Sequence, residues 1–269
     1  MKRPFLSVLL AVLLSSTSGV TAAGERPRLA LVIDDLGWNL RAGERVLALP
    51  GAITVAVLPG TPVGSELARR AHTHGIEIML HQPMAAETGV APGTGYLQPG
   101  MAPAELTHRL RTNLEEIPYH RGVSNHMGSL ATRCENTMAV VMSELAERGL
   151  YFLDSRTTHR SVAYSSARDA LIPAIRRDVF IDNILDTQAI ERALEAAVSL
   201  AEERGHAVAI GHPHAVTLAV LETKLPEIMD RVELVPVSAL VAEPTLTATR
   251  KQSERSATAA MPIRDTVAP

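Results

Sequence analysis

Aromatic residues are scarce in this sequence: they make up 3% of it, and Trp38 is the sole tryptophan. A module that only binds glycans grips sugar rings on several aromatic faces, so the shortage weakens that class of function. Cysteine is nearly absent as well, because Cys134 stands alone and no intramolecular disulfide can support the fold. We expect Cys134 to be a small, partly buried residue. The formal net charge is only −3 and no basic run is present, so nucleic acid is not an expected partner.

The N-terminus has the pattern of an export signal. Lys2 and Arg3 form a basic start, residues 5–14 are almost wholly apolar, and Ala22 and Ala23 offer small residues to a signal peptidase. We therefore predict a signal peptide over residues 1–23 and an exported protein, periplasmic or secreted. The alternative is an uncleaved membrane anchor, but the apolar run is shorter than the roughly 20 residues that a bilayer requires. No later stretch is long and apolar enough, so no membrane span is expected after cleavage.

The composition changes again near Pro244. Thr, Ala, Ser, Arg and Pro dominate residues 244–269, which cannot bury enough apolar surface to order themselves, so a disordered tail is predicted there. Residues 24–243 remain, a length that suits one large α/β domain better than two small ones. Nothing in the sequence indicates an oligomeric state.

Residues 24–243 alternate short β-rich apolar runs with longer amphipathic stretches. Strands are predicted at 29–34, 52–58, 76–81, 121–125, 150–154, 178–182, 207–212 and 232–237. Because each crossover helix returns the chain to the same edge of the sheet, the sheet should be parallel. The number of units favours a distorted (β/α) barrel of seven to eight parallel strands, and the alternative is an open, doubly wound sheet.

Three helices carry clear end signals. One opens near Pro103 and stops at Pro118, and another starts with Asn136 as its N-cap and ends at Gly149. The longest is expected over residues 187–204, ending at Gly205.

Polar side chains stand where the predicted strands end. These residues are Asp34, Asp35, His81, Asn125, His126, Asp154, Ser155, Asp182, Asn183, His212 and His214. In a parallel barrel all these ends lie on one face, where such barrels place their active sites. Asp154 or Asp182 taken alone is equally well explained as a turn former or a helix N-cap. The coincidence at six strand ends favours a functional site.

Asp34 and Asp35, combined with two histidines from other strands, have the composition of a metal site. Two imidazoles and one carboxylate leave open positions on zinc or a similar divalent ion, so that a bound water becomes nucleophilic near neutral pH. The same set can hold iron, so the ligands alone do not decide the metal. Successive residues of a strand point to opposite faces, so one aspartate is expected to be a ligand and the other a base or an orienting residue. The alternative is a capping pair of aspartates with structurally satisfied histidines.

Five segments carry a resemblance to a known family. They are residues 32–37 (Val-Ile-Asp-Asp-Leu-Gly), 80–84 (Leu-His-Gln-Pro-Met), 125–129 (Asn-His-Met-Gly-Ser), 152–155 (Phe-Leu-Asp-Ser) and 210–214 (Ile-Gly-His-Pro-His). Together they resemble the divergent polysaccharide deacetylases, relatives of the NodB-type carbohydrate deacetylases, over nearly all of residues 28–240. The resemblance implies a distorted α/β barrel, one divalent metal ion, expected to be zinc, and removal of N- or O-acetyl groups from an envelope polysaccharide.

The resemblance also implies roles for single residues. In the broader group the motif Thr-Phe-Asp-Asp-Gly carries a general base followed by a metal ligand, and Asp34 and Asp35 match these two positions. The group's Leu-x-x-His motif holds the general acid, which His212 approximates. The group has a second metal histidine four residues after the first, but here the residue four after His81 is Ala85.

Further predictions follow from these departures. His126 is expected to complete a metal set with Asp35 and His81, and the group's Arg-x-Pro-x-Gly motif has no clear counterpart. The stretch from Pro83 to Pro103 is expected to form a rim or lid over the site. Residues expected to contact the substrate or support the ligands are Trp38, Tyr96, Asn125, Ser129, Asp154, Ser155, Asp182 and His214; for the two aromatics the alternative is plain packing.

Two other classes of function remain open at this stage. One is a catalytically silent envelope protein that keeps the barrel and its metal but binds a glycan or a partner protein. The other is a different metal-dependent hydrolase, such as an amidase or phosphoesterase, because the ligand set does not encode the substrate.

Overall fold

The computed structural model describes residues 26–241. Its strands are β1 (Arg28–Leu36), β2 (Thr54–Val57), β3 (Glu77–Met84), β4 (His120–Met127), β5 (Tyr151–Asp154), β6 (Ala174–Arg176), β7 (Val179–Phe180), β8 (His206–Gly211) and β9 (Glu233–Leu234). Its helices are α1 (Leu40–Leu47), α2 (Gly64–Thr73), α3 (Pro103–Glu116), α4 (Glu135–Arg148), α5 (Ala163–Asp169), α6 (Thr187–Arg204), α7 (Ala215–Arg231) and α8 (Val237–Val241), with a 3-10 turn at Ala131–Arg133.

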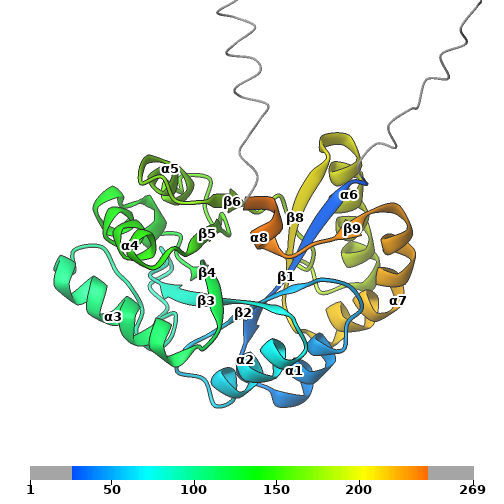
Figure 1. Cartoon of the computed structure of the whole chain (residues 1–269), viewed down its shortest axis with the longest axis horizontal. Helices are drawn as coiled ribbons and strands as arrows, with labels where there is room; N and C mark the ends of the chain where they lie inside the picture. Colours follow the sequence, from blue (N-terminus) through cyan, green and yellow to red (C-terminus); the bar gives the residue numbers. More distant parts are fainter. Residues whose placement is uncertain (1–25, 242–269) are drawn as a thin grey trace, which may run out of the picture.

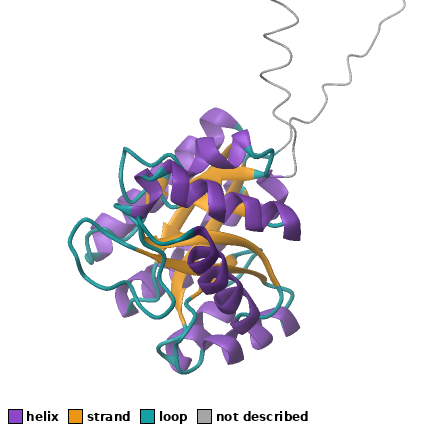
Figure 2. Cartoon of the chain, turned by 90° about the vertical axis from the view of Figure 1, so that its left-hand side faces the viewer, coloured by secondary structure: helices purple, strands orange, loops and turns teal. Residues whose placement is uncertain are grey.

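The strands form one curled parallel sheet. Its order is β6-β5-β4-β3-β2-β1-β8-β7, and β9 pairs with the start of β1. Helices α1 to α7 pack on the outer, convex side, as Figures 1 and 2 show, whereas a doubly wound sheet carries helices on both faces. The predicted distorted α/β barrel is therefore confirmed, as a half-barrel whose strand order runs from β6 to β7.

Alternate residues of each strand divide between an outer and an inner core. In β1, Leu29, Leu31 and Ile33 join the outer core under the helices, whereas Ala30 and Val32 join the inner core of the barrel. Because side chains alternate along a strand, the next inner position after Val32 is that of residue 34. The same alternation gives inner positions to residue 81 in β3, residue 126 in β4 and residue 212 after β8. The barrel therefore directs a set of predicted site residues into its mouth.

Helix α8 fills the opposite mouth, at the N-terminal ends of the strands. Oε1 of Glu77 accepts hydrogen bonds from Tyr151 Oη at 2.9 Å, from Thr54 Oγ1 at 3.1 Å and from the backbone N–H of Ser238 at 3.1 Å. Val237 and Leu240 of α8 add apolar contacts to the inner core. The segment after β9 thus closes the base of the barrel and leaves the carboxyl ends of the strands for chemistry.

Several element predictions need correction. Helix α4 begins after Cys134 rather than at an Asn136 cap, although it ends at Gly149 in the left-handed region (φ 64°) as predicted. The predicted strand 178–182 is paired only over Val179–Phe180, and strand β6 was not predicted. The predicted strand 232–237 is paired only over Glu233–Leu234, and its last residue already belongs to α8.

The longest predicted helix is confirmed. Helix α6 starts at Asp186, whose side chain accepts a hydrogen bond from Ala189 N, and ends at Gly205 with φ 84°. None of the helices within residues 26–241 has both the length and the apolar character that a membrane crossing needs. The predicted signal peptide (1–23) and tail (244–269) lie outside the described residues.

Candidate metal centre

An irregularity at the end of β1 turns two neighbouring carboxylates toward the same partner. The pairing of β1 with β2 shifts register between Ile33 and Leu36, and Asp35 adopts a positive φ of 60°. Such a conformation is strained for a residue with a Cβ and is concentrated at functional sites. Nε2 of His81 consequently lies 3.5 Å from Asp34 Oδ2 and 3.2 Å from Asp35 Oδ1. A regular strand would have sent the two side chains to opposite faces.

Asp35, His81 and His126 form the predicted three-ligand set. Their ligand atoms all lie within 4.8 Å of one another, and Asp35 Oδ1 is 2.8 Å from His126 Nδ1. By the geometry of its neighbours, this buried oxygen has no hydrogen-bond partner among the described residues. Three atoms of ligand type therefore converge at the end of β1. A tetrahedral zinc ion separates its ligand atoms by about 3.3 Å, so the three residues fit a divalent ion with small side-chain adjustments.

Ser124 orients the first histidine of the set. Its hydroxyl lies 2.7 Å from Nδ1 of His81, and both side chains are buried. Because Nδ1 is engaged by this partner, Nε2 is left to face the two aspartates. Ser124 was missed from the sequence, although its place two residues before His126 puts it on the same inner side of β4.

The two aspartates have opposite electrostatic environments. Burial raises the pKa of the Asp34 carboxyl above its ordinary value, and the nearby His81 and His212 only partly oppose this. Burial acts in the same direction on Asp35, but the close imidazoles of His126 and His81 outweigh it and hold the pKa of that carboxyl well below its usual range. Asp34 is therefore the better proton acceptor and Asp35 the better anionic ligand.

His212 and Asp182 form a carboxylate–imidazole pair at the same mouth. Nδ1 of His212 lies 2.9 Å from Asp182 Oδ1, and Asp182 Oδ2 accepts hydrogen bonds from His212 N at 2.6 Å and from Thr217 Oγ1 at 2.9 Å. Burial disfavours the imidazolium, but the bond to Asp182 and the charges of Asp34 and Asp35 prevail and raise the pKa of His212 to about 9. At neutral pH this imidazole is a proton donor.

Two other predicted residues hold the backbone. Asn125 accepts a hydrogen bond from Ser155 N at 3.0 Å and donates to Met127 O at 2.8 Å, so it ties the end of β4 to that of β5. Asp154 accepts bonds from Arg156 N and Ser161 Oγ, both at 2.8 Å, as a turn-forming aspartate does. Their contacts explain their burial without a substrate. The Ser155 hydroxyl, by contrast, is buried and has no partner among the described residues.

The remaining predicted contact residues lie outside the ligand set. Trp38, three residues after Asp35, is 64% exposed and free to meet a ligand. Tyr96 packs against the outer core beside Arg109, which favours the packing explanation for it. The hydroxyl of Ser129 accepts a hydrogen bond from Glu87 N at 3.0 Å, a loop contact. His214 is exposed at the start of α7.

The expected lid after β3 is fastened to the barrel. The buried Gln82 amide donates to Pro83 O and Gly95 O, and Asn113 of α3 donates to both Gln82 Oε1 and Gly95 O. Backbone bonds join Ala85 and Leu97 as well. These contacts attach the segment around Gly95–Leu97 to the end of β3, so this part of the stretch lies against the barrel.

Arg177 is a further residue that sequence analysis missed. Its guanidinium lies 3.7 Å above the Phe180 ring and donates to Ser155 O at 2.7 Å and Arg156 O at 2.9 Å. It therefore clamps the loop after β5 to β7, and its charge interacts with Asp34. No motif in the sequence marks this arginine.

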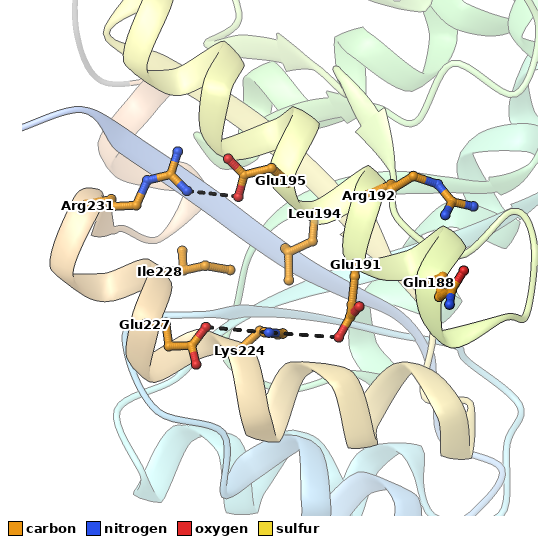
Figure 3. A pocket seen from close by; sticks show the side chains of 9 residues that line it. All are labelled: Gln188, Glu191, Arg192, Leu194, Glu195, Lys224, Glu227, Ile228 and Arg231. Carbon is orange, nitrogen blue, oxygen red and sulfur yellow. Dashed lines mark hydrogen bonds and ion pairs between the residues drawn. The ribbon is translucent and has the colours of Figure 1, made fainter.

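A separate hollow of about 570 Å³ lies between α6 and α7, on the outside of the barrel (Figure 3). Lys224 pairs there with Glu191 and Glu227, and Arg231 pairs with Glu195. Paired surface charges over Leu194 and Ile228 are ordinary for a groove between two helices, so we assign it no function.

Fold and site define a parallel α/β barrel protein with an Asp-His-His centre at the carboxyl ends of its strands. Residues 31–241 match the family model of the divergent polysaccharide deacetylases, and the chain belongs to this family. The uncharacterized protein YibQ of Escherichia coli K12 is 37% identical over 234 residues, which cover 87% of this chain and 72% of YibQ.

Two solved structures share the fold. The uncharacterized protein ATU2773 of Agrobacterium tumefaciens C58 has a TM-score of 0.77 at 25% identity, covering 81% of this chain and 91% of that one. BA3943 of Bacillus anthracis, described as a CE4 family pseudoenzyme, has a TM-score of 0.52 at 13% identity, covering 81% of this chain and 66% of that one. The second likeness shows the fold alone.

Proposed function

We propose that the protein is an exported, metal-dependent deacetylase that hydrolyses N- or O-acetyl groups of an envelope polysaccharide. The carrying observation is the convergence of three kinds of group at one mouth of the barrel. These are the Asp-His-His centre, a second buried carboxylate in Asp34 and a carboxylate-paired imidazole in His212. Family membership supports the class of substrate.

Asp35, His81 and His126 would hold the ion. When bound, a divalent ion such as zinc supplies Lewis acidity that lowers the pKa of a water and polarises an acetyl carbonyl. The open side of a three-ligand site leaves room for both. We propose zinc because two imidazoles and a carboxylate suit it, and metal analysis decides the matter.

Asp34 and His212 would divide the proton transfers. The buried Asp34 carboxylate lies against His81 and has a free Oδ1, so it is placed to take a proton from the attacking water. Protonated His212, held by Asp182, is placed to give a proton to the departing amine or alkoxide. Before each turnover Asp34 must be ionised and His212 protonated. The raised pKa of His212 favours the second condition, and the charges of His81 and His212 act toward the first by opposing the effect of burial on the pKa of Asp34.

Acetate release tests the proposal. The purified protein is incubated with N- and O-acetylated envelope polysaccharides, with and without a chelator and with zinc added back. We expect release that the chelator abolishes and zinc restores. No release from any acetylated glycan by the zinc-loaded protein would overturn the proposal.

A silent glycan-binding protein is the second candidate. Two observations favour it: Ala85 occupies the position of the usual second metal histidine, and a protein of this fold, BA3943, is described as a pseudoenzyme. The same experiment separates the two candidates, because a silent protein binds the polysaccharide in a pull-down but releases no acetate. Phosphate or amine release in place of acetate would indicate a different hydrolase.

A further inference from the structure

A second group of ligand-type side chains lies at the mouth of the barrel. One carboxylate oxygen of Asp182 and one ring nitrogen each of His212 and His214 lie within 4.8 Å of one another. Asp182 follows β7, and the two histidines flank Pro213 in the turn between β8 and α7. A backbone hydrogen bond of 2.8 Å from His214 N to His212 O folds this turn tightly and brings the rings to a centroid distance of 5.9 Å.

The separations within this group are compatible with a bound ion as well as with the hydrogen bond that joins two of its members. Nδ1 of His212 and Oδ1 of Asp182 are 2.9 Å apart, close to the separation of about 3.3 Å between neighbouring ligands of a tetrahedral zinc ion. The group is also asymmetric: Asp182 is buried and fixed by Thr217, whereas His214 is exposed. No hydrogen bond holds the His214 ring within residues 26–241, so it can turn toward the other two.

We propose that Asp182, His212 and His214 form a second site for a divalent ion of the zinc class, distinct from the Asp35–His81–His126 centre. Asp182 supplies Oδ1, His212 supplies Nδ1 and His214 closes the site from the solvent side. The site is weaker than the first, because one of its ligands is exposed to solvent and the ion must replace the Nδ1 proton of His212, which passes to solvent.

Occupation of this site inhibits the reaction, a consequence that rests on the proposed function. His212 bound through Nδ1 retains only its Nε2 proton and is no longer an imidazolium, so it is lost as the general acid. One metal equivalent therefore activates the protein and an excess inhibits it. Because His214 is a ligand of the second site alone, the inhibition by excess metal depends on this residue.

Equilibrium dialysis of the full chain against Zn²⁺ tests the site without any substrate. We expect two bound ions per chain at saturation, in a tight and a weaker class. His214→Ala should weaken the second class by about tenfold or more and leave the first intact. His214 makes no side-chain capping bond to α7, so the variant should fold. Asp35→Asn should have the reverse effect, and His159→Ala, which removes an exposed imidazole elsewhere, should leave both classes unchanged.

Acetate release supplies the second measurement. The ratio of rates at one and at ten equivalents of Zn²⁺ should exceed about fivefold for the parent and approach unity for His214→Ala. Saturation at a single ion per chain, or a second class that survives His214→Ala, overturns the second site. If the protein releases no acetate under any condition, the proposed deacetylase activity fails while the dialysis result still decides the site.

Discussion

His212 is held by Asp182 through two hydrogen bonds at once, one from ring Nδ1 to Oδ1 and one from the backbone N–H to Oδ2. A carboxylate that accepts hydrogen bonds from both the ring and the backbone fixes the orientation of the imidazole. It also stabilises the protonated form of the ring. Because Nδ1 is occupied, Nε2 is the atom left to meet a substrate. The first two predictions concern this pairing of Asp182 with His212.

Asp182→Asn should lower the pKa of His212 from about 9 toward the ordinary value of roughly 6.5. The amide keeps much of the shape but no longer stabilises the imidazolium by charge. Proton NMR titration of the His212 ring in the metal-free protein measures the shift, with Asp169→Asn on exposed α5 as the control. A midpoint that stays near 9 in Asp182→Asn would contradict the assignment.

The stability of the metal-free protein should depend on pH through the same pair. The pKa of His212 is higher in the fold than in the unfolded chain, so its contribution is complete below pH 6.5 and is lost as pH rises through 9. The contribution is on the order of 3 kcal/mol. Urea unfolding of the parent minus that of Asp182→Asn should shrink over this window, and a difference that does not vary with pH would refute the linkage.

Asp34→Asn and Asp35→Asn should separate base from ligand. Asp34→Asn removes a proton acceptor, so hydrolysis should fall by roughly 10² to 10⁴ while zinc stays bound. Asp35→Asn removes a direct ligand, and metal content and activity should fall together. Zinc content is measured beside acetate release for both variants and the parent. Equal metal loss in both variants would erase the distinction, and an active Asp34→Asn protein would remove Asp34 from the mechanism.

Ser124→Ala should weaken zinc binding by about 10 to 100-fold, because His81 loses the partner that orients its ring. His81→Ala and His126→Ala should lower occupancy more strongly. Competition with a chromogenic chelator measures the affinity, and Ser165→Ala on α5, whose hydroxyl bonds only Val162 O, is the matched control. Full metal content in both histidine variants would show that the ligands are elsewhere.

Tyr151→Phe should destabilise the fold without touching the metal. The hydroxyl donates to Glu77 beneath α8, and the loss of this buried bond costs about 1 to 2 kcal/mol. The free energy of unfolding in urea should fall by this amount while zinc affinity stays at the parental value. Tyr119→Phe, at an exposed ring, should change neither. A drop in zinc affinity would mean that the base of the barrel and its mouth are coupled.

Because side chains alternate between the two faces of a strand, much of the candidate site could be predicted from the sequence. Residues 30, 32 and 34 fall on one side of β1, and the inner positions of β3 and β4 end in His81 and His126. Strand ends rich in Asp and His, spaced along a βα pattern, therefore predicted both the face and the members of the centre. The outward positions of Asn125 and Asp154 follow from the same alternation, which would have assigned them to backbone support.

Other features depend on contacts between distant segments. Arg177 reaches the loop after β5 through its side chain, and the left-handed backbone of Asp35 arises from a register shift that no local pattern encodes. Strand β6 has only three residues, too few for a periodic signal. Helix α4 begins directly after Cys134, which is also the C-cap of the preceding 3-10 turn, so the start of the helix depends on that turn and not on a capping side chain.

The closed base of the barrel determines where the protein can be immobilised without blocking its mouth. Glu233 N donates to Pro27 O at 2.8 Å, so the two ends of the described chain meet beside the start of β1, and Figure 1 shows β1 entering on the side where α8 lies. The described chain therefore both begins and ends at the base of the barrel, with Val241 of α8 packed against the inner core. A resin, a capture surface or a reporter linked to this base would leave the mouth of the barrel facing outward and accessible to a large polymer.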